Sequence, residues 1–200
     1  MNNELIDKIK SIIAKSDESA IATVRDIEKA IVEAENPNFK DKKPGDHFMY
    51  RGIEWVILGW EQGGVLCVTA EPIGKMPFDK NGNNNWRESS LREYLNTVFL
   101  AKLGEDDALL TIQSDLVADN GDGAYGTAVD YVGLLSCDLY REYRDVIPRY
   151  ENWIWTCTPW ACVPTNAYHV RNVLSSGGLS DNGANYVGGV VPACVFIDNQ

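Results

Sequence analysis

The spacing of hydrophobic residues changes near residue 45 and divides the chain into two predicted parts. Over residues 3–35 apolar side chains recur every three or four positions, which is typical of helices. We expect two short helices, the second capped by Ser16 with Asp17 and Glu18 in its first turn. The apolar stripe of the second helix consists of Ala20, Val24, Ile27, Ile31 and Ala34. This stripe either packs on the body of the protein or pairs with other copies of the chain.

Residues 36–44 are polar, include two prolines and read as a linker. The sequence therefore predicts a helical segment with its linker over 1–40 and a second domain over 45–200. In that domain, the runs 46–59 and 65–70 are rich in β-branched and aromatic residues and predict two strands. The segment 60–64, which contains two glycines, predicts the hairpin turn between them.

The middle of the domain mixes predicted loops with short helices. Residues 72–85 and 115–130 are rich in Gly, Asn and Asp and predict loops, whereas 104–112 predicts a short helical turn. The residues predicted to share one face of a helix that begins near Trp86 are Leu91, Tyr94, Leu95, Val98 and Phe99. The run 132–135 predicts a short buried strand, and Ser136 is expected to cap a helix over 137–144 that Pro148 stops.

The last quarter of the chain predicts a scaffold that presents a binding surface. Apolar residues at 153–155 and 190–197 predict core strands, and the stretch between them is polar and dotted with aromatic residues. Binding residues lie disproportionately on such anchored loops, and binding surfaces favour Tyr, Ser, Gly and Asn. The candidate ligand-contacting residues are Thr156, Trp160, Thr165, Asn166, Tyr168, His169, Arg171, Asn172, Ser175, Asp181, Asn182, Asn185 and Tyr186.

Composition and charge narrow the class of partner. The chain has 200 residues, of which 44% are hydrophobic, so it is large enough to bury a core. Its net charge of −11 and the lack of a basic stripe argue against nucleic acid as a partner. Binding to anionic membrane surfaces is disfavoured for the same reason, and no apolar run approaches the length of a membrane span.

The cysteines indicate where the chain is made. There are five, and an odd number leaves at least one without a partner in the same chain. No signal peptide is visible in the first residues, which mix acidic, basic and apolar side chains. We therefore expect synthesis in a reducing cytoplasm with free thiols. A phage particle assembled in that cytoplasm would have the same features, so a virion or cell-surface location stays open.

Four motifs carry a resemblance to a known family. In order they are Trp86-x-x-Ser89-x-Leu91-Arg92-x-x-Leu95-Asn96, Asp130-x-Val132-x-Leu134-Leu135-Ser136, Trp155-x-x-Thr158-Pro159 and Gly189-Val190-x-Pro192-Ala193. This order resembles an uncharacterised bacterial and phage domain similar to the C-type-lectin-like fold group, over roughly residues 45–197. That group includes formylglycine-generating enzymes and the variable proteins of diversity-generating retroelements.

The resemblance implies an α+β fold of the C-type-lectin-like type, with a twisted antiparallel sheet, two flanking helices and long loops. It also implies a hypervariable segment before the final core strand. Retroelement variable proteins diversify by mutation of adenines in Asn codons, which produce many of the residue types at the candidate positions, although not Trp160 or Pro164. The chain departs from the family at Cys157 and Val191, which stand where the family has arginines.

Some residues are candidates for redox or metal chemistry. Cys157 and Cys162 are a candidate thiol pair for an oxidase of the formylglycine-generating type, or two small buried side chains. A zinc site is disfavoured because the cysteine spacing is wrong and His169 lacks a second histidine nearby. The loop with Asp119 and Asp122 suits either calcium or a simple turn, and the turn is favoured.

Three further groups of residues are not assigned to a ligand or to catalysis. Arg92 and Asp130 are expected to form a structural pair. Trp86, Trp153 and Trp155 are predicted to be core residues. No catalytic set assembles around His47 or His169.

The sequence predicts a recognition protein without enzymatic activity and without a cofactor. Its ligand would be a protein or glycan surface bound by the loops of residues 156–187. Two alternatives stay open. One is the oxidase that uses Cys157 and Cys162, and the other is a structural phage or cell-surface protein assembled through the stripe of residues 20–34.

Overall fold

The computed structural model describes residue 11, residues 37–104 and residues 108–198. The chain divides into two compact units, residues 1–37 and 38–200. In the first unit only Ser11, which is helical and exposed, and Pro37 are described. The predicted helices of residues 3–35, the Ser16 cap and the apolar stripe therefore lie outside the described residues.

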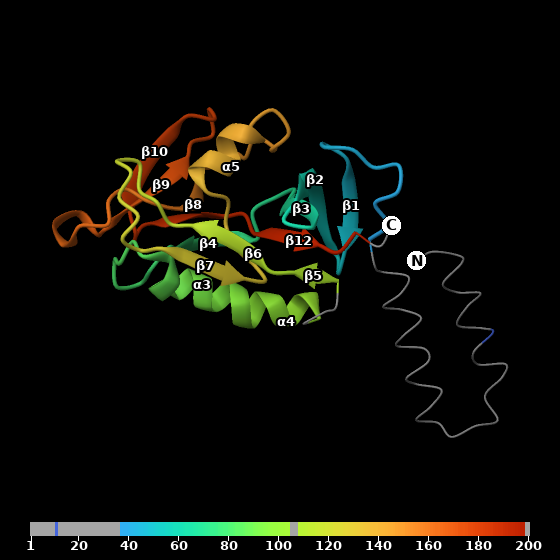
Figure 1. Ribbon diagram of the computed structural model, residues 1–200, viewed down its shortest axis with the longest axis horizontal. Coiled ribbons are helices and arrows are strands. Elements are labelled where there is room, and N and C mark those ends of the chain that lie inside the picture. Colours follow the sequence, from blue (N-terminus) through green and yellow to red (C-terminus); the bar gives the residue numbers. More distant parts are fainter. Residues whose placement is uncertain (1–10, 12–36, 105–107, 199–200) are drawn as a thin grey trace, which may run out of the picture. The chain divides into compact units, whose positions relative to one another are not determined.

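A five-stranded antiparallel sheet forms one part of the second unit (Figure 1). Its order is β1 (His47–Tyr50), β2 (Ile53–Glu61), β3 (Gly64–Thr69), β12 (Ala193–Phe196) and β5 (Leu109–Leu110). The run 46–59 was predicted as one strand, but it contains a turn at Arg51–Gly52, where φ is 50° and 74°. The next turn, at Gln62–Gly63, also has two positive φ angles, of 51° and 81°. Such pairs suit tight two-residue hairpins, so Trp60 and Glu61 belong to β2 rather than to the predicted turn.

A second five-stranded sheet supports the last quarter of the chain. Its order is β10 (Leu179–Gly183), β9 (His169–Val173), β8 (Ile154–Pro159), β11 (Val187–Val190) and β4 (Gly74–Pro77). All neighbours are antiparallel except β8 and β11, which are parallel. Strand β4 lies in the segment 72–85, so the prediction of a loop there was partly wrong.

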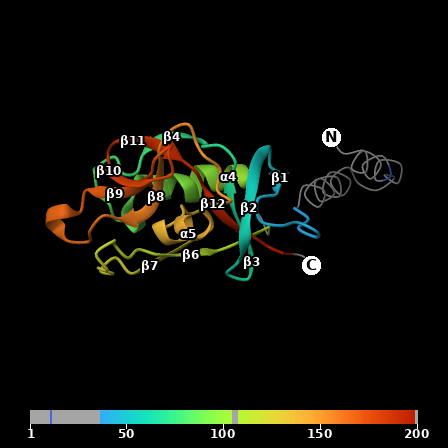
Figure 2. The ribbon, with the colours of Figure 1, turned by 90° about the horizontal axis from the view of Figure 1, so that it is seen from above.

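A two-stranded ribbon, β6 (Ile112–Asp115) with β7 (Thr127–Asp130), occupies part of the predicted loop of residues 115–130. Of the helical turn predicted over 104–112, residues 109–110 form β5 and Ile112 begins β6, whereas residues 105–107 lie outside the described residues. Burial alternates along β6: Ile112 and Ser114 are buried, whereas Gln113 and Asp115 are exposed. The run 132–135 is buried as predicted, but its only β pairing is a bridge between Gly133 and Ala193. Seen from above, the ribbon lies on one side of the domain, and β4 and β11 lie on the other (Figure 2).

The longest helix of the described residues runs from Ser90 to Leu103 as α3 (Ser90–Tyr94), a π-helical turn (Leu95–Phe99) and α4 (Leu100–Leu103). It follows a short 3₁₀ turn, Trp86–Glu88, and Ser89 caps it by accepting a hydrogen bond from the Arg92 N–H. The residues that face the core lie at four-residue steps and are Leu91, Leu95, Phe99 and Leu103. Val98 was predicted to share this face, but it is 52% exposed.

The second helix, α5 (Cys137–Glu142), begins as predicted. The Ser136 side chain accepts a hydrogen bond from the Leu139 N–H, which satisfies one of the free donors of the first turn. Together, two sheets, a ribbon and two helices make a sheet-rich α+β fold. Among the residues that the structure describes, no helix is long and apolar enough to cross a membrane.

The core is dominated by aromatic side chains. Phe196 is surrounded by Phe48, Tyr50 and Trp55, with ring centroids 5.1–5.3 Å away in edge-to-face arrangements. Trp86 and Trp155 are fully buried as predicted, and Trp153 is partly buried beside Trp155. The final strand β12 therefore anchors the end of the described chain in the core.

Residues of the first two motifs form a polar network within this scaffold, which we call the Asp130 network: Trp86, Arg92 and Asp130. The Trp86 indole N–H donates to one Asp130 carboxylate oxygen at 3.0 Å. The Arg92 guanidinium reaches the other oxygen at 2.7 Å, and Asp130 is 5% exposed. The predicted structural pair of Arg92 and Asp130 is confirmed.

Cys157 and Val191, the two positions at which the chain departs from the motifs that it resembles, do not lie together in this structure. Cys157 and Val191 are both buried, but they lie in different hydrophobic clusters. Each is therefore accommodated separately as a small apolar side chain.

Candidate ligand-binding surface

Strands β8, β9 and β10 bring exposed aromatic side chains together at one end of the second sheet. Because these strands are antiparallel, the end of β8, the start of β9 and the end of β10 meet there. Trp160 is 42% exposed, Tyr168 50% and Tyr186 60%. We call this end, with Trp160, Tyr168, His169 and Tyr186, the aromatic surface; the loop 160–168 lies at the left of Figure 1, in orange.

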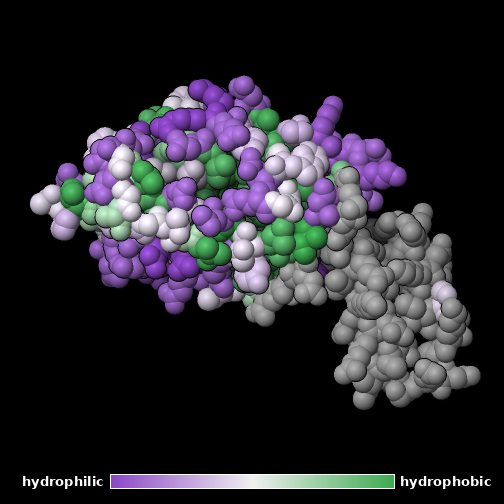
Figure 3. Space-filling model, in the orientation of Figure 1, coloured by the Kyte–Doolittle hydropathy of each residue, from purple (hydrophilic) through white to green (hydrophobic). Residues whose placement is uncertain are grey.

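Polar candidates accompany these rings. Thr165 and Asn166 are exposed in a 3₁₀ turn (Pro164–Asn166), and Asn185 is exposed beside Tyr186. Asn182 is half-buried on β10 next to them. In the space-filling view this end of the domain is mostly pale, which means intermediate hydropathy, whereas strongly hydrophilic residues cover much of the neighbouring face (Figure 3).

Ser175 does not belong to the aromatic surface. It is exposed in the turn between β9 and β10, where the Leu174 N–H donates to the Gly178 carbonyl at 2.8 Å. The five residues of β9 separate this turn from Tyr168 and Trp160, a distance of roughly 16 Å. The structure therefore places the predicted Ser175 at the opposite end of the strands.

Thr156 and Asn172 were predicted to contact a ligand, and the structure corrects this because both are buried. Thr156 is 1% exposed, and its hydroxyl donates to the Arg171 carbonyl at 2.8 Å, so it joins β8 to β9. Asn172 is 0% exposed, and its side-chain amide has no hydrogen-bond partner among the described residues. Both faces of β9 are covered near these positions, so a polar residue there does not imply contact with solvent.

Charged residues beside the aromatic surface pair with one another. We call Asp119, His169, Arg171 and Asp181 the Arg171 network. The Arg171 guanidinium lies 2.8 Å from Asp119 and 3.6 Å from Asp181, and the Trp160 ring covers it at 5.1 Å. His169 Nδ1 lies 2.5 Å from the other Asp181 oxygen. The charges of this region are therefore largely matched within the protein.

A buried asparagine that the sequence did not single out fixes the backbone beneath the aromatic surface. The Asn84 amide donates to the carbonyls of Ala161 and His169 at 2.9 and 2.8 Å, and its oxygen accepts from the Tyr125 hydroxyl at 2.8 Å. The Asn84 backbone N–H also donates to the Ala167 carbonyl at 3.1 Å. Asn84 is 0% exposed, so these bonds hold the loop 160–169 without competition from water.

The thiol chemistry required by the oxidase alternative finds little support. Burial raises the pKa of Cys157 to about 12 and also raises the pKa of Cys162, so both favour the neutral thiol. The Cys162 thiol lies 3.3 Å from the Asp122 carbonyl, and all five cysteines are free and buried. A thiolate that attacks a substrate or binds a metal needs a lowered pKa, which is the opposite shift.

The loop around Asp119 and Asp122 adopts the turn that the sequence favoured. The Ala124 N–H donates to Asp122, the Asp122 N–H donates to the Asn120 side chain, and Gly121 has a φ of 84°. Asp119 is bound to Arg171 and also lies 3.7 Å from Arg141. In the part of the chain that the structure describes, no group of three His, Cys, Asp or Glu side chains is arranged to hold a metal ion.

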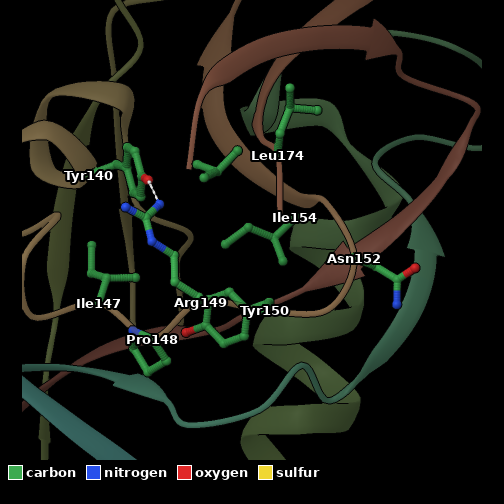
Figure 4. A pocket seen from close by; sticks show the side chains of 9 residues that line it. Tyr140, Ile147, Pro148, Arg149, Tyr150, Asn152, Ile154 and Leu174 are labelled. Carbon is green, nitrogen blue, oxygen red and sulfur yellow. Dashed lines mark hydrogen bonds between the residues drawn. The ribbon is translucent and has the colours of Figure 1, made fainter. Parts of the chain in front are cut away.

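Two hollows lie away from the aromatic surface. One has a volume of about 10 Å³, room for about one water molecule, and the Arg149 guanidinium crosses it to donate to the Tyr140 hydroxyl at 3.0 Å (Figure 4). The other, of about 340 Å³, is lined only by residues of the segment 87–97, which include Arg92 and Asn96. Neither contains a residue predicted to bind a ligand.

Comparisons of the chain with protein-family models, with curated proteins and with solved structures found no match.

Proposed function

We propose that this protein is a recognition protein without enzymatic activity, which binds a protein or glycan ligand through the aromatic surface. The observation that carries the proposal is that three exposed aromatic residues, Trp160, Tyr168 and Tyr186, lie at the same end of β8–β10. Large flat side chains with a polar atom give much contact area at a low cost in conformational entropy. The buried Asn84 holds the backbone beneath them, which reduces the cost of ordering on binding.

We further propose that the scaffold is a C-type-lectin-like domain. The ordered motifs support this, since their residues serve as helix cap, core and the Asp130 network. Two helices flank the sheets, and the last core strand follows the loop-rich segment, as the resemblance implies. Synthesis in the cytoplasm followed by placement on a phage virion or a cell surface is consistent with five free cysteines.

The proposed role resembles that of a diversity-generating retroelement variable protein. Positions whose side chains are exposed or half-buried tolerate substitution with little loss of stability. Those positions are Thr165, Asn166, Tyr168, Asn182, Asn185 and Tyr186. Buried Asn172 and Thr156 support the strands and are expected to stay constant.

Binding is tested on arrays of immobilised proteins and glycans, with a matched control. The test variant replaces Trp160, Tyr168 and Tyr186 with alanine. The control variant replaces three equally exposed residues elsewhere, Val98, Val129 and Tyr131. Ligands retained by the wild type and the control should lose at least about tenfold in affinity for the test variant. Equal binding by both variants would place the ligand elsewhere, and no binding at all would remove the proposal.

Sequencing the genes around this one tests the retroelement role separately. A near-copy of the codons for residues 155–187 beside a reverse-transcriptase gene is expected. Its differences should fall on adenines and on the exposed positions named above. Differences concentrated at Asn172 or Thr156 would contradict the proposal that these buried residues stay constant while the exposed positions vary. The lack of any near-copy would leave a recognition protein of fixed specificity.

A further inference from the structure

Strand β10 is the outer strand of the second sheet, and no strand of the described residues pairs with its other edge. The Ala184 N–H donates to the Tyr168 carbonyl, and Leu174 N–H to the Gly178 carbonyl, so even-numbered residues of β10 bond to β9. In an antiparallel pair, hydrogen-bonded and non-hydrogen-bonded positions alternate. The N–H groups of Leu179, Asp181 and Gly183 therefore point away from the sheet.

These outward groups form an open row. Among the described residues, no hydrogen bond is made by the N–H groups of residues 179, 181 and 183 or by the carbonyls of residues 179 and 181. The Gly183 carbonyl accepts from the Tyr186 N–H at 2.9 Å. Alternate residues of a strand lie roughly 7 Å apart, which is the spacing that a second strand needs. Three donors and two acceptors are thus presented at the repeat of a β ladder.

At other strand edges of the described chain, side chains bond to the outward backbone groups or hinder pairing with another strand. Gln62 caps the outer edge of β6, where it bonds both the N–H and the carbonyl of Gln113. Asn96 accepts from the Tyr131 N–H where β7 ends, and the Lys42 ammonium group donates to the His47 carbonyl on β1. Strand β4 contains Lys75 and Pro77, residue types that block edge pairing.

Strand β10 has none of these protective features. It is continuous with the aromatic surface. Its sequence, Leu179 to Gly183, contains neither lysine nor proline, and every residue is half-buried. It leads directly into Asn185 and Tyr186. Natural proteins generally protect edges of this kind, so an open edge beside a proposed binding surface points to use in binding.

We propose that the ligand is a protein, and that an extended segment of it pairs with the free edge of β10 as a sixth strand of the sheet. Main-chain hydrogen bonds then supply affinity, and flanking side chains supply specificity. Tyr186 and Asn182 flank this edge. This inference rests on the proposed function and narrows its ligand from a protein or glycan to an extended peptide.

The net charge of the protein restricts which peptide segments can bind. The protein carries a net charge of −11, which repels an acidic segment. Asp181 is already matched by His169 and Arg171, so the edge itself demands no particular charge. The expected segment is therefore neutral or basic, with β-branched or aromatic residues that favour an extended conformation.

A displayed library of short linear peptides is the probe, selected on the wild-type full chain. Binding of the selected peptides is then compared between the variants D181A and D181P. Both lose the carboxylate, but only D181P loses the outward N–H. Proline is tolerated where the N–H of an edge strand faces solvent, so the β9–β10 ladder is expected to persist. Amide exchange at residues 180 and 182, which bond to β9, verifies that it does.

Two results are expected if β10 is the docking strand. The selected peptides should bind D181P at least about tenfold more weakly than they bind D181A, because only D181P lacks the outward N–H. Amide exchange at residues 179, 181 and 183 should slow on adding a peptide, since these N–H groups then gain carbonyl partners.

Other results would refute strand pairing at β10, and they can be distinguished from results that refute the proposed function. Peptides that bind D181P as tightly as D181A, or that leave exchange at residues 179, 181 and 183 unchanged, would refute strand pairing. If such peptides still need Trp160, Tyr168 and Tyr186, the aromatic surface stands as the binding site. If the library yields no binder while the glycan array does, the ligand class assigned here is wrong and the proposed function survives.

Discussion

The Asp130 network and the Arg171 network use the same residue types for opposite purposes. Each joins an arginine to at least one aspartate and has a tryptophan in contact with it, Trp86 within the first network and Trp160 over Arg171 of the second. In the first, Trp86 is fully buried and donates its indole N–H to the carboxylate. In the second, Trp160 is 42% exposed, and its ring lies over the Arg171 guanidinium. One tryptophan completes the core, and the other covers an ion pair while leaving much of its ring to solvent.

The difference shows what burial does to a polar cluster. The Asp130 side chain is 3% exposed, so each of its oxygens must have a partner inside the protein. Asp119 and Asp181 are 29% and 27% exposed, so water assists them. Loss of a partner should therefore be costly in the Asp130 network and modest in the Arg171 network.

Among variants that remove a carboxylate from either network, the largest expected effect is that of D130A. It leaves the Trp86 indole N–H without an acceptor in the core and removes the counter-ion of Arg92. We expect a loss of about 3 kcal/mol in the free energy of unfolding, which is within the range for breaking a buried pair. Urea unfolding followed by tryptophan fluorescence measures it.

A matched control for D130A is D138A. The Asp138 side chain is 91% exposed and pairs with Arg141 within one helix. Its loss should change stability little, since surface pairs contribute little. Similar effects of the two variants would show that the Asp130 network is not a structural centre.

A smaller effect is expected from N84A, which removes the support of the loop 160–169. The carbonyls of Ala161 and His169 lose their donor, and Tyr125 loses its acceptor. We expect a loss of about 2 kcal/mol, together with faster amide exchange in this loop. N81A is the control, because the Asn81 side chain is exposed and makes no hydrogen bond to the described residues. If N84A leaves exchange in the loop unchanged, Asn84 does not position the aromatic surface.

The Arg171 network should show coupling between its two carboxylates. D119A or D181A alone still leaves Arg171 one counter-ion, so each should cost about 0.5–1 kcal/mol. The double variant leaves a guanidinium that is only 12% exposed without a carboxylate. Its cost should exceed the sum of the single costs, which a double-mutant cycle measures. Simple additivity would mean that Asp119 and Asp181 do not share Arg171.

Sequence reasoning found the Arg92–Asp130 pair of the Asp130 network but missed Asn84. An arginine on the buried side of a helix demands a carboxylate, and Asp130 was the candidate beside a buried run. Asn84 stands in a stretch of three asparagines, Asn83–Asn85, where nothing in the sequence marks the one that points inward. Its role depends on carbonyls of the loop 160–169, about 80 residues along the chain.

The elements that were missed share a second cause. Strands β4 and β7 lie in segments rich in glycine, asparagine and aspartate, where the propensity for turns outweighs that for strands, and β6 begins at the end of the predicted helical turn. Their pairing partners supply the stability that their own sequences lack. Thr156 and Asn172 were misplaced because polar residues were read as exposed, although β9 is covered on both faces near them.

The smallest effect on stability, and the largest separation between stability and binding, is expected for W160A. The ring contributes a cation–π contact with Arg171 worth about 0.5–1 kcal/mol at a partly exposed site. Its core counterpart W86A should cost about 4 kcal/mol, because it leaves a large cavity and an unpaired Asp130. Yet W160A should weaken ligand retention on the arrays, whereas any loss for W86A should follow the fraction unfolded. If W160A destabilised the fold as much as W86A does, Trp160 would be a structural residue, and the exposed aromatic end of β8–β10 would have to be explained as part of the scaffold.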